Sequence, residues 1–185
     1  FAQDNQLFLA TNRNLPDEFE AIIFEQKGVA KHELFIADTQ HDPDFFIATY
    51  QFMPEPGKFG DLYTIMSLKL PRQVTPIIID ARSNNMWQVS NLPQGFRIGP
   101  QLYLEGNFQK YFRLYCVEGE ERNVLEVITP DRMVLFIDEF KDWDIEIWKD
   151  RIYLYQKKDI SFEGGELPSL FRMLMSLSKE FRGSP

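Results

Sequence analysis

The order in which hydrophobic periodicity changes along the chain constrains its fold most. Through the first two thirds, short runs of β-branched and aromatic residues alternate with turn residues, which is typical of strands. Helical spacing of apolar residues stands out later, at 129–140 and at 167–181. This is not the regular strand–helix alternation of a doubly wound parallel sheet. It predicts an α+β fold with a mostly antiparallel sheet, one or two packed helices and a C-terminal amphipathic helix.

The predicted strands are joined by turns rich in Asp, Asn, Gly and Pro. The polar segment 38–44 lies between two β-rich runs and predicts a hairpin. Pro71 and Pro76 are expected to separate two strands and to place one of them at a sheet edge, because proline cannot donate to a ladder. The strand candidates are 20–25, 32–37, 45–52, 61–70, 74–80 and 111–117.

A second hairpin is predicted around Lys149 and Asp150. Apolar and polar residues alternate on both sides of this pair, at 143–148 and 152–155. In this interpretation Asp144 and Glu146 lie on the solvent side of the first strand. Strand 111–117 alternates in the same way and places Cys116 on the buried face, as a core residue and not a reactive thiol.

Thr129-Pro130-Asp131 is the strongest helix start in the chain. Threonine can accept from first-turn amides, proline suits the first helical position, and aspartate favours the positive end of the helix dipole. The preceding residues 121–128 are a candidate for a second, shorter helix.

The last predicted helix opens near Pro168 and is closed by Gly183. We expect its apolar stripe to cover the sheet of its own domain, with docking on another chain as the alternative. The stripe consists of Leu167, Leu170, Phe171, Leu174, Leu177 and Phe181, with Met173 and Met175 at its borders.

Composition narrows the class of protein. The chain has 185 residues, enough for one globular domain over 1–185, and it begins with Phe1, so we expect it to be a piece of a longer protein. One cysteine forbids an internal disulfide, and two histidines make a closed zinc site improbable. A net charge of −8 opposes nucleic-acid binding, so the ring pair Tyr111/Tyr115 is assigned to a half-buried sheet face and not to base stacking.

Two groups of residues are the candidates for a metal site. His32 and His41 flank the first hairpin, where Asp38, Asp42 or Asp44 could supply a third ligand. We interpret both histidines as exposed turn residues.

The second group, Asp142, Asp144 and Glu146, has the spacing that opens a calcium loop. The sixth and twelfth positions hold Ile147 and Tyr153 where such a loop needs glycine and a bidentate acid. We therefore assign this group to a solvated helix end and strand face, and predict no metal or cofactor.

Motifs of enzymes are absent from the sequence. There is no Gly-x-Ser-x-Gly, no Cys–His motif, no P-loop and no Gly-x-Gly-x-x-Gly. A carboxylate-dependent hydrolase, with or without an assisting metal ion, is the alternative, with acids near 138–146 or 38–44. A further alternative is a small aromatic or apolar ligand bound among the 27 aromatic rings.

No apolar run approaches the roughly 20 residues of a spanning helix. Glycosylation sequons are absent, as are disulfides, which favours a reducing compartment, the cytoplasm or the cytoplasmic face of a membrane. Exported bacterial proteins often lack both features as well.

Four segments form a recognisable succession: 104–115 with Phe108 and a Tyr-Phe pair, 127–133 with Thr129-Pro130 and Met133, the acidic strand 143–147 and the tyrosine strand 151–155. Over these roughly 50 residues the chain resembles an uncharacterised family of bacterial proteins. The resemblance implies a soluble α+β domain placed after membrane-spanning segments, with no assigned activity and no catalytic residues to carry over.

The sequence therefore predicts a non-enzymatic interaction or scaffold domain of a bacterial, membrane-tethered protein. Its partner is expected to be a protein. Contact with a membrane is expected only through segments outside this sequence, and the oligomeric state stays open.

Overall fold

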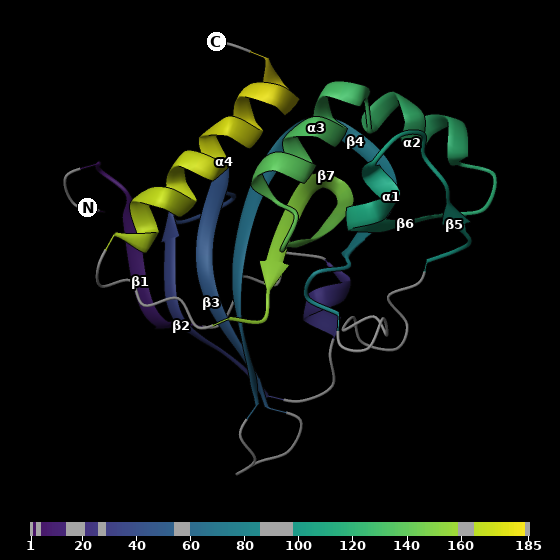
Figure 1. The fold of residues 1–185 in the computed structure, drawn as a ribbon. Coiled ribbons are helices and arrows are strands. Elements are labelled where there is room, and N and C mark those ends of the chain that lie inside the picture. Colours follow the sequence, from purple (N-terminus) through teal and green to yellow (C-terminus); the bar gives the residue numbers. More distant parts are fainter. Residues whose placement is uncertain are drawn as a thin grey trace. The chain divides into compact units, whose positions relative to one another are not determined.

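The chain has an α+β fold with a mostly antiparallel seven-stranded sheet, as predicted (Figure 1). The computed structural model describes residues 2, 5–13, 21–25, 29–53, 60–85, 98–158 and 165–183. The elements are β1 (Phe8–Arg13), the 3-10 helix η1 (Ile22–Glu25), β2 (Val29–Ala37), β3 (Phe45–Met53), β4 (Asp61–Ala81), β5 (Gln101–Leu102), α1 (Phe108–Tyr111), β6 (Phe112–Cys116), α2 (Glu121–Val127), α3 (Pro130–Glu139), β7 (Asp144–Gln156) and α4 (Glu166–Arg182).

The chain divides into two compact units, which are described separately. The first unit comprises 1–69 and 155–185, and the second comprises 70–154. Strands β4 and β7 belong to both units: β4 is divided after Lys69, and β7 is divided after Leu154. The single domain expected over 1–185 stays a prediction.

In the first unit, β1, β2, β3 and the first part of β4 pair in that order, all antiparallel. The hairpin predicted around 38–44 is confirmed, because β2 and β3 pair from Ala37↔Phe46 to Val29↔Met53. Strand β1 was not among the predicted strands.

The predicted strand at 20–25 is wrong. Residues Ile22–Glu25 form the 3-10 helix η1, and the Phe24 N–H donates to the Ala21 carbonyl at 3.0 Å. Tertiary packing accounts for the difference: Ile23 is fully buried, and the Phe24 ring packs edge-on against Tyr50 of β3. A short apolar run has no periodicity that could distinguish the two outcomes.

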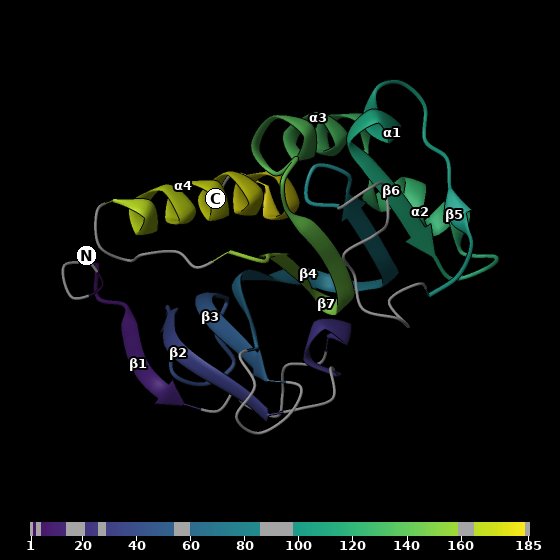
Figure 2. The same ribbon diagram turned by 60° about the horizontal axis from the view of Figure 1, so that its bottom comes forward.

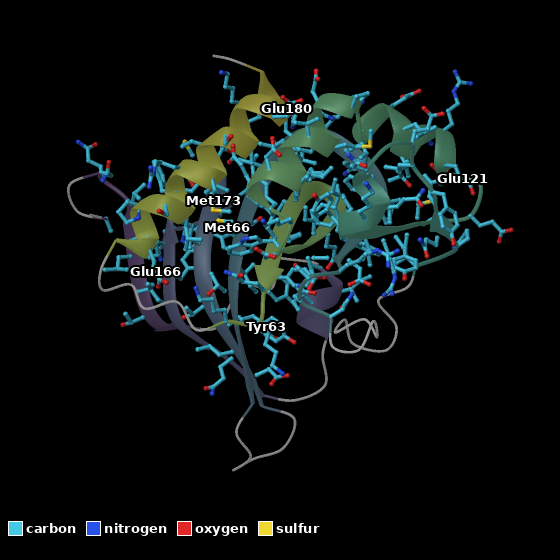
Figure 3. The ribbon with its side chains drawn as sticks, in the orientation of Figure 1. Tyr63, Met66, Glu121, Glu166, Met173 and Glu180 are labelled. Carbon is cyan, nitrogen blue, oxygen red and sulfur yellow. The ribbon has the colours of Figure 1, made fainter. Side chains whose placement is uncertain are left out.

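Helix α4 packs by its apolar stripe, as predicted. The half-buried Phe171 ring meets Phe45 of β3 edge-on, with centroids 5.6 Å apart. Arg182 donates to the Lys69 carbonyl at 2.9 Å and to the Asp44 carboxylate at 3.0 Å. Figure 2 shows α4 lying along one face of β1, β2 and β3, and Figure 3 labels Glu166 and Glu180 at its two ends. The buried members of the stripe are Leu167, Leu170, Leu174, Leu177 and Phe181.

The two strands predicted at 61–70 and 74–80 are one strand, β4, of 21 residues. Proline is tolerated here because of where the neighbouring ladders stop. The register with β3 ends at Leu68, and the register with β6 begins at Ile77, so Pro71 and Pro76 lie in the interval between them. As a whole, β4 is not the edge strand that the prolines predicted, since it pairs with β3, β6 and β7.

In the second unit, β6 pairs with both β4 and β5, and three helices accompany these strands. The predicted start of α3 is confirmed, because the Thr129 side chain accepts from the Arg132 N–H and Pro130 is the first helical residue. The helix expected at 121–128 is confirmed as α2.

The second predicted hairpin is wrong, because β7 is one strand of 13 residues. Both halves of β7 belong to a strand that pairs with the long β4, so no chain reversal is needed. At Lys149, where a turn was expected, the backbone of β7 is locally irregular: its φ of 56° lies in the left-handed region.

Candidate functional site: a groove beside helix α2

A groove of about 500 Å³ opens in the second unit, between the middle of β4 and helix α2. Its residues come from 72–76 of β4, from the end of β6 and from α2. They are Arg72, Gln73, Val74, Thr75, Pro76, Val117, Glu120, Asn123, Glu126 and Val127. The groove is therefore assembled from two parts of the chain about 40 residues apart in sequence.

A tight turn after β6 places α2 on this side of β4. Gly119 has a φ of 86°, a conformation that glycine adopts without strain, and its N–H donates to the Glu121 carboxylate at 3.2 Å. The Glu120 N–H donates to the Val117 carbonyl at 3.1 Å. Helix α2 then begins at Glu121, which Figure 3 labels.

The lining combines apolar and charged groups. Val74 and Pro76 are half-buried, Val127 is buried, and Val117 is 37% exposed, so part of the surface is apolar and accessible to a ligand. Glu120 and Glu126 give the α2 side an acidic character, and Glu120 also accepts from the Asn123 amide. Arg72 is exposed on the strand side. Such a mixture suits a ligand that is itself both apolar and charged.

The charged groups of the lining are Arg72, Glu120 and Glu126, and none of the lining residues is a histidine, cysteine or lysine. Cys116, at the end of β6, is fully buried as predicted. Burial raises the pKa of its thiol, with further contributions from Glu121 and Glu120, so the unreactive thiol form is favoured.

The acidic candidates at 142–146 do not form a common site. Asp142 is exposed, whereas Asp144 is 1% exposed and Glu146 is fully buried, so the predicted solvent-facing side of this strand is wrong. Asp144 accepts from the Ala81 N–H and from the Asn84 amide, each at 2.9 Å. Period-two alternation failed here because this strand is covered on both faces.

The two histidines proposed as metal ligands at the first hairpin lie in different elements. His41 is exposed in the turn, as interpreted, and the Thr39 hydroxyl donates to its carbonyl at 2.9 Å. The turn placement predicted for His32 is wrong, because His32 lies within β2 opposite Tyr50; its side chain falls outside the described residues.

The three turn acids each have a partner in the first unit. Asp38 accepts from the Phe45 N–H at 3.4 Å, Asp42 forms an ion pair with Lys69, and Asp44 forms one with Arg182. Over the described ranges, no three His, Cys, Asp or Glu side chains are placed together to hold a metal ion.

The sequence did not predict a buried polar cluster around Asp80. Asp80 is fully buried and accepts from the Asn85 amide at 3.0 Å and from the Arg113 guanidinium at 3.4 Å. Asp80 and Arg113 are direct cross-strand partners in the β4–β6 ladder. Only the strand register brings the two charges together, so the sequence carried no signal for this pair.

Comparison with known proteins identifies a solved structure with a similar fold. Neither a protein-family model nor a curated protein matches the sequence. The fold is similar to the crystal structure of the mycobacterial trehalose monomycolate transport factor A, TtfA, with a TM-score of 0.62 and 8% identity. The match covers 100% of this chain and 92% of that one. In the parts of this chain that the structure describes, no helix is long and apolar enough to cross a membrane.

Proposed function

We propose that this chain is a non-enzymatic protein-interaction domain and that the groove beside α2 is its docking surface. The groove itself is the observation that carries the proposal. It offers accessible apolar surface at Val117, acidic groups at Glu120 and Glu126, and a length of strand on its opposite side. Recognition surfaces combine apolar contact with charges that fix orientation in this way.

The contacts of the buried acids give no support to the hydrolase that was the alternative at 138–146. A hydrolase of the carboxylate type needs two convergent acids beside a cleft. Asp144 is held by Ala81 and Asn84, and Asp80 by Asn85 and Arg113. These two buried carboxylates are hydrogen-bonded within the fold and do not line the groove, whose acids are Glu120 and Glu126 of the α2 side.

The setting of the domain is also part of the proposal. The resemblance over 104–155 supports a bacterial protein that is tethered to its membrane by segments outside this sequence. The domain would then present the groove to a partner protein near the membrane. Sequencing the complete gene tests this part, because a reading frame without a hydrophobic segment of about 20 residues would contradict tethering.

A photo-crosslinker placed in the groove tests the interaction. We would replace Asn123 with p-benzoylphenylalanine in the complete protein in its own bacterium, with the same replacement at the exposed Asp138 of α3 as the matched control. We expect a discrete protein adduct from position 123 and none from 138. No adduct at 123, or equal adducts at both positions, would refute the groove as the docking surface.

A second candidate function is binding of a small amphiphile. A volume of about 500 Å³ falls within the range of small-molecule sites, and the similar structure is that of a trehalose monomycolate transport factor. Titration of the protein with a fluorescent C12 lysophospholipid below its micelle concentration tests this alternative. Saturable binding that is lost in Val117→Glu but kept in Val134→Glu would favour the amphiphile. Binding unaffected by Val117→Glu would reject it.

A further inference from the structure

We infer that the groove takes an extended, basic segment of a partner polypeptide, which adds as a strand to the free edge of β4 beside α2. This inference rests on the proposed interaction function and specifies the form of the partner. Strand addition lets main-chain hydrogen bonds supply affinity, while side chains read the neighbouring surfaces.

Within the described residues, the β4–β6 ladder stops before it reaches the groove. Its last pair is Ile77↔Cys116, and the chain then leaves the ladder through the Val117–Glu120 turn into α2. The edge of β4 at 72–75 therefore faces the groove instead of a continuation of β6.

The direction of the backbone groups follows from two hydrogen bonds at the ladder. The Arg82 N–H donates to the Tyr111 carbonyl at 2.7 Å, so even-numbered residues of β4 direct their N–H and C=O groups toward β6. The Ala81 N–H donates to Asp144 of β7, which places β7 along the other edge.

Pro71 and Pro76 limit how much of the β4 edge is available to an added strand. Pro76 has no N–H to donate to an added strand, and Pro71 stands just before the other end of the segment. The short edge between them suits one extended segment of a few residues. Prolines at both ends also protect the edge from uncontrolled pairing with other copies of the chain.

Charge on the helical side specifies the partner further. Between 117 and 127, four glutamates stand against one arginine, and Glu120 and Glu126 line the groove. A strand inserted between β4 and α2 would direct some of its side chains toward these carboxylates. Basic residues there would gain charge complementarity, and an apolar residue between them would cover Val117.

Peptide display tests this inference with ligands of defined sequence. Random dodecapeptides on phage would be selected on the folded chain, and enriched peptides would be synthesised for fluorescence-anisotropy binding. We expect sequences in which Lys or Arg alternates with apolar residues. The double variant Glu120→Lys/Glu126→Lys should weaken their binding at least tenfold. The control Asp138→Lys/Asp142→Lys, with the same charge change at exposed positions outside the groove, should change it less than twofold.

N-methylation of the peptides separates strand addition from other modes of binding, and it leaves the protein unchanged. Methylating alternate backbone nitrogens in one phase should abolish binding, whereas the other phase should preserve it. Equal affinity of both phases, enrichment of acidic peptides, or no enrichment at all would overturn the inference. A groove-specific protein crosslink at position 123 together with phase-independent peptides would retain the proposed function and reject only strand addition.

Discussion

Replacing Asp144 provides the sharpest test of the packing in the second unit. Sequence alternation predicts an exposed carboxylate at this position, whereas the structure buries it against Ala81 and Asn84. Asp144→Ala removes the acceptor from the buried Ala81 N–H and one partner from the half-buried Asn84 amide. The backbone donor then stays buried without the partner that it has in the native fold.

The expected loss of stability follows from these two bonds. A hydrogen bond to a charged acceptor contributes about 1.5–3 kcal/mol, and the bond from the half-buried Asn84 adds about 1 kcal/mol. Together they predict a decrease in the free energy of unfolding of about 2–4 kcal/mol. For a chain of this size that corresponds to a fall in Tm of about 5–15 °C. Asp144→Asn keeps an oxygen acceptor for Ala81 and should lose less than half as much.

Tryptophan fluorescence during urea unfolding is the appropriate assay. All three tryptophans, at 87, 143 and 148, fall within residues 70–154, so the signal reports on the second unit. Asp142→Ala, two residues earlier and exposed, is the matched control and should change stability by no more than about 0.5 kcal/mol. If Asp144→Ala and Asp142→Ala have equal midpoints, the buried placement of Asp144 is refuted.

Four further predictions concern other parts of the fold. Leu174→Ala should destabilise by about 2–5 kcal/mol because Leu174 is fully buried in α4, whereas the partly exposed Met175→Ala should cost less than about 1 kcal/mol; equal thermal midpoints would contradict the packing of α4. Lys149→Gly should stabilise by about 1 kcal/mol in urea unfolding, since it relieves a left-handed backbone at a non-glycine residue, and a loss of stability would contradict this. Gly99→Ala should destabilise markedly in thermal unfolding, because a Cβ there would meet the Cys116 carbonyl oxygen at 2.0 Å, and a neutral result would mean that the two backbones are not in contact. Burial raises the pKa of the Cys116 thiol, so stability should fall as pH rises above about 9, where the unfolded thiol ionises first, and a Cys116→Ala variant should lose this pH dependence.

Local signals predicted the elements whose stability is local. The Thr129 cap with Pro130, and the polar turn at 38–44, specify a helix start and a hairpin through contacts only a few residues apart. The stripe at 167–181 specified its buried face because a helix with one apolar side must cover it. These features need no knowledge of the partner element, which is why the α+β class could be read from the chain.

Elements that depend on distant partners could not be read in the same way. Pro71 and Pro76 argued for a strand break, but β4 continues because its ladders with β3 and β6 leave the prolines between them. Lys149 and Asp150 argued for a turn, but β7 continues along β4. In both cases a long partner strand, far away in sequence, overrode the local preference.

The candidate site illustrates the same limit. The groove joins residues 72–76 to residues 117–127, and nothing in either segment alone indicates the other. Among the described residues, the β4–β6 ladder stops short of this groove because β6 ends at Cys116 and the chain turns into α2. Composition and periodicity thus determined the layers, the caps and the buried stripe, which depend on neighbours in sequence. Strand register determined the groove and the burial of Asp144, because pairing between distant segments decides which backbone edges and carboxylates remain exposed to water.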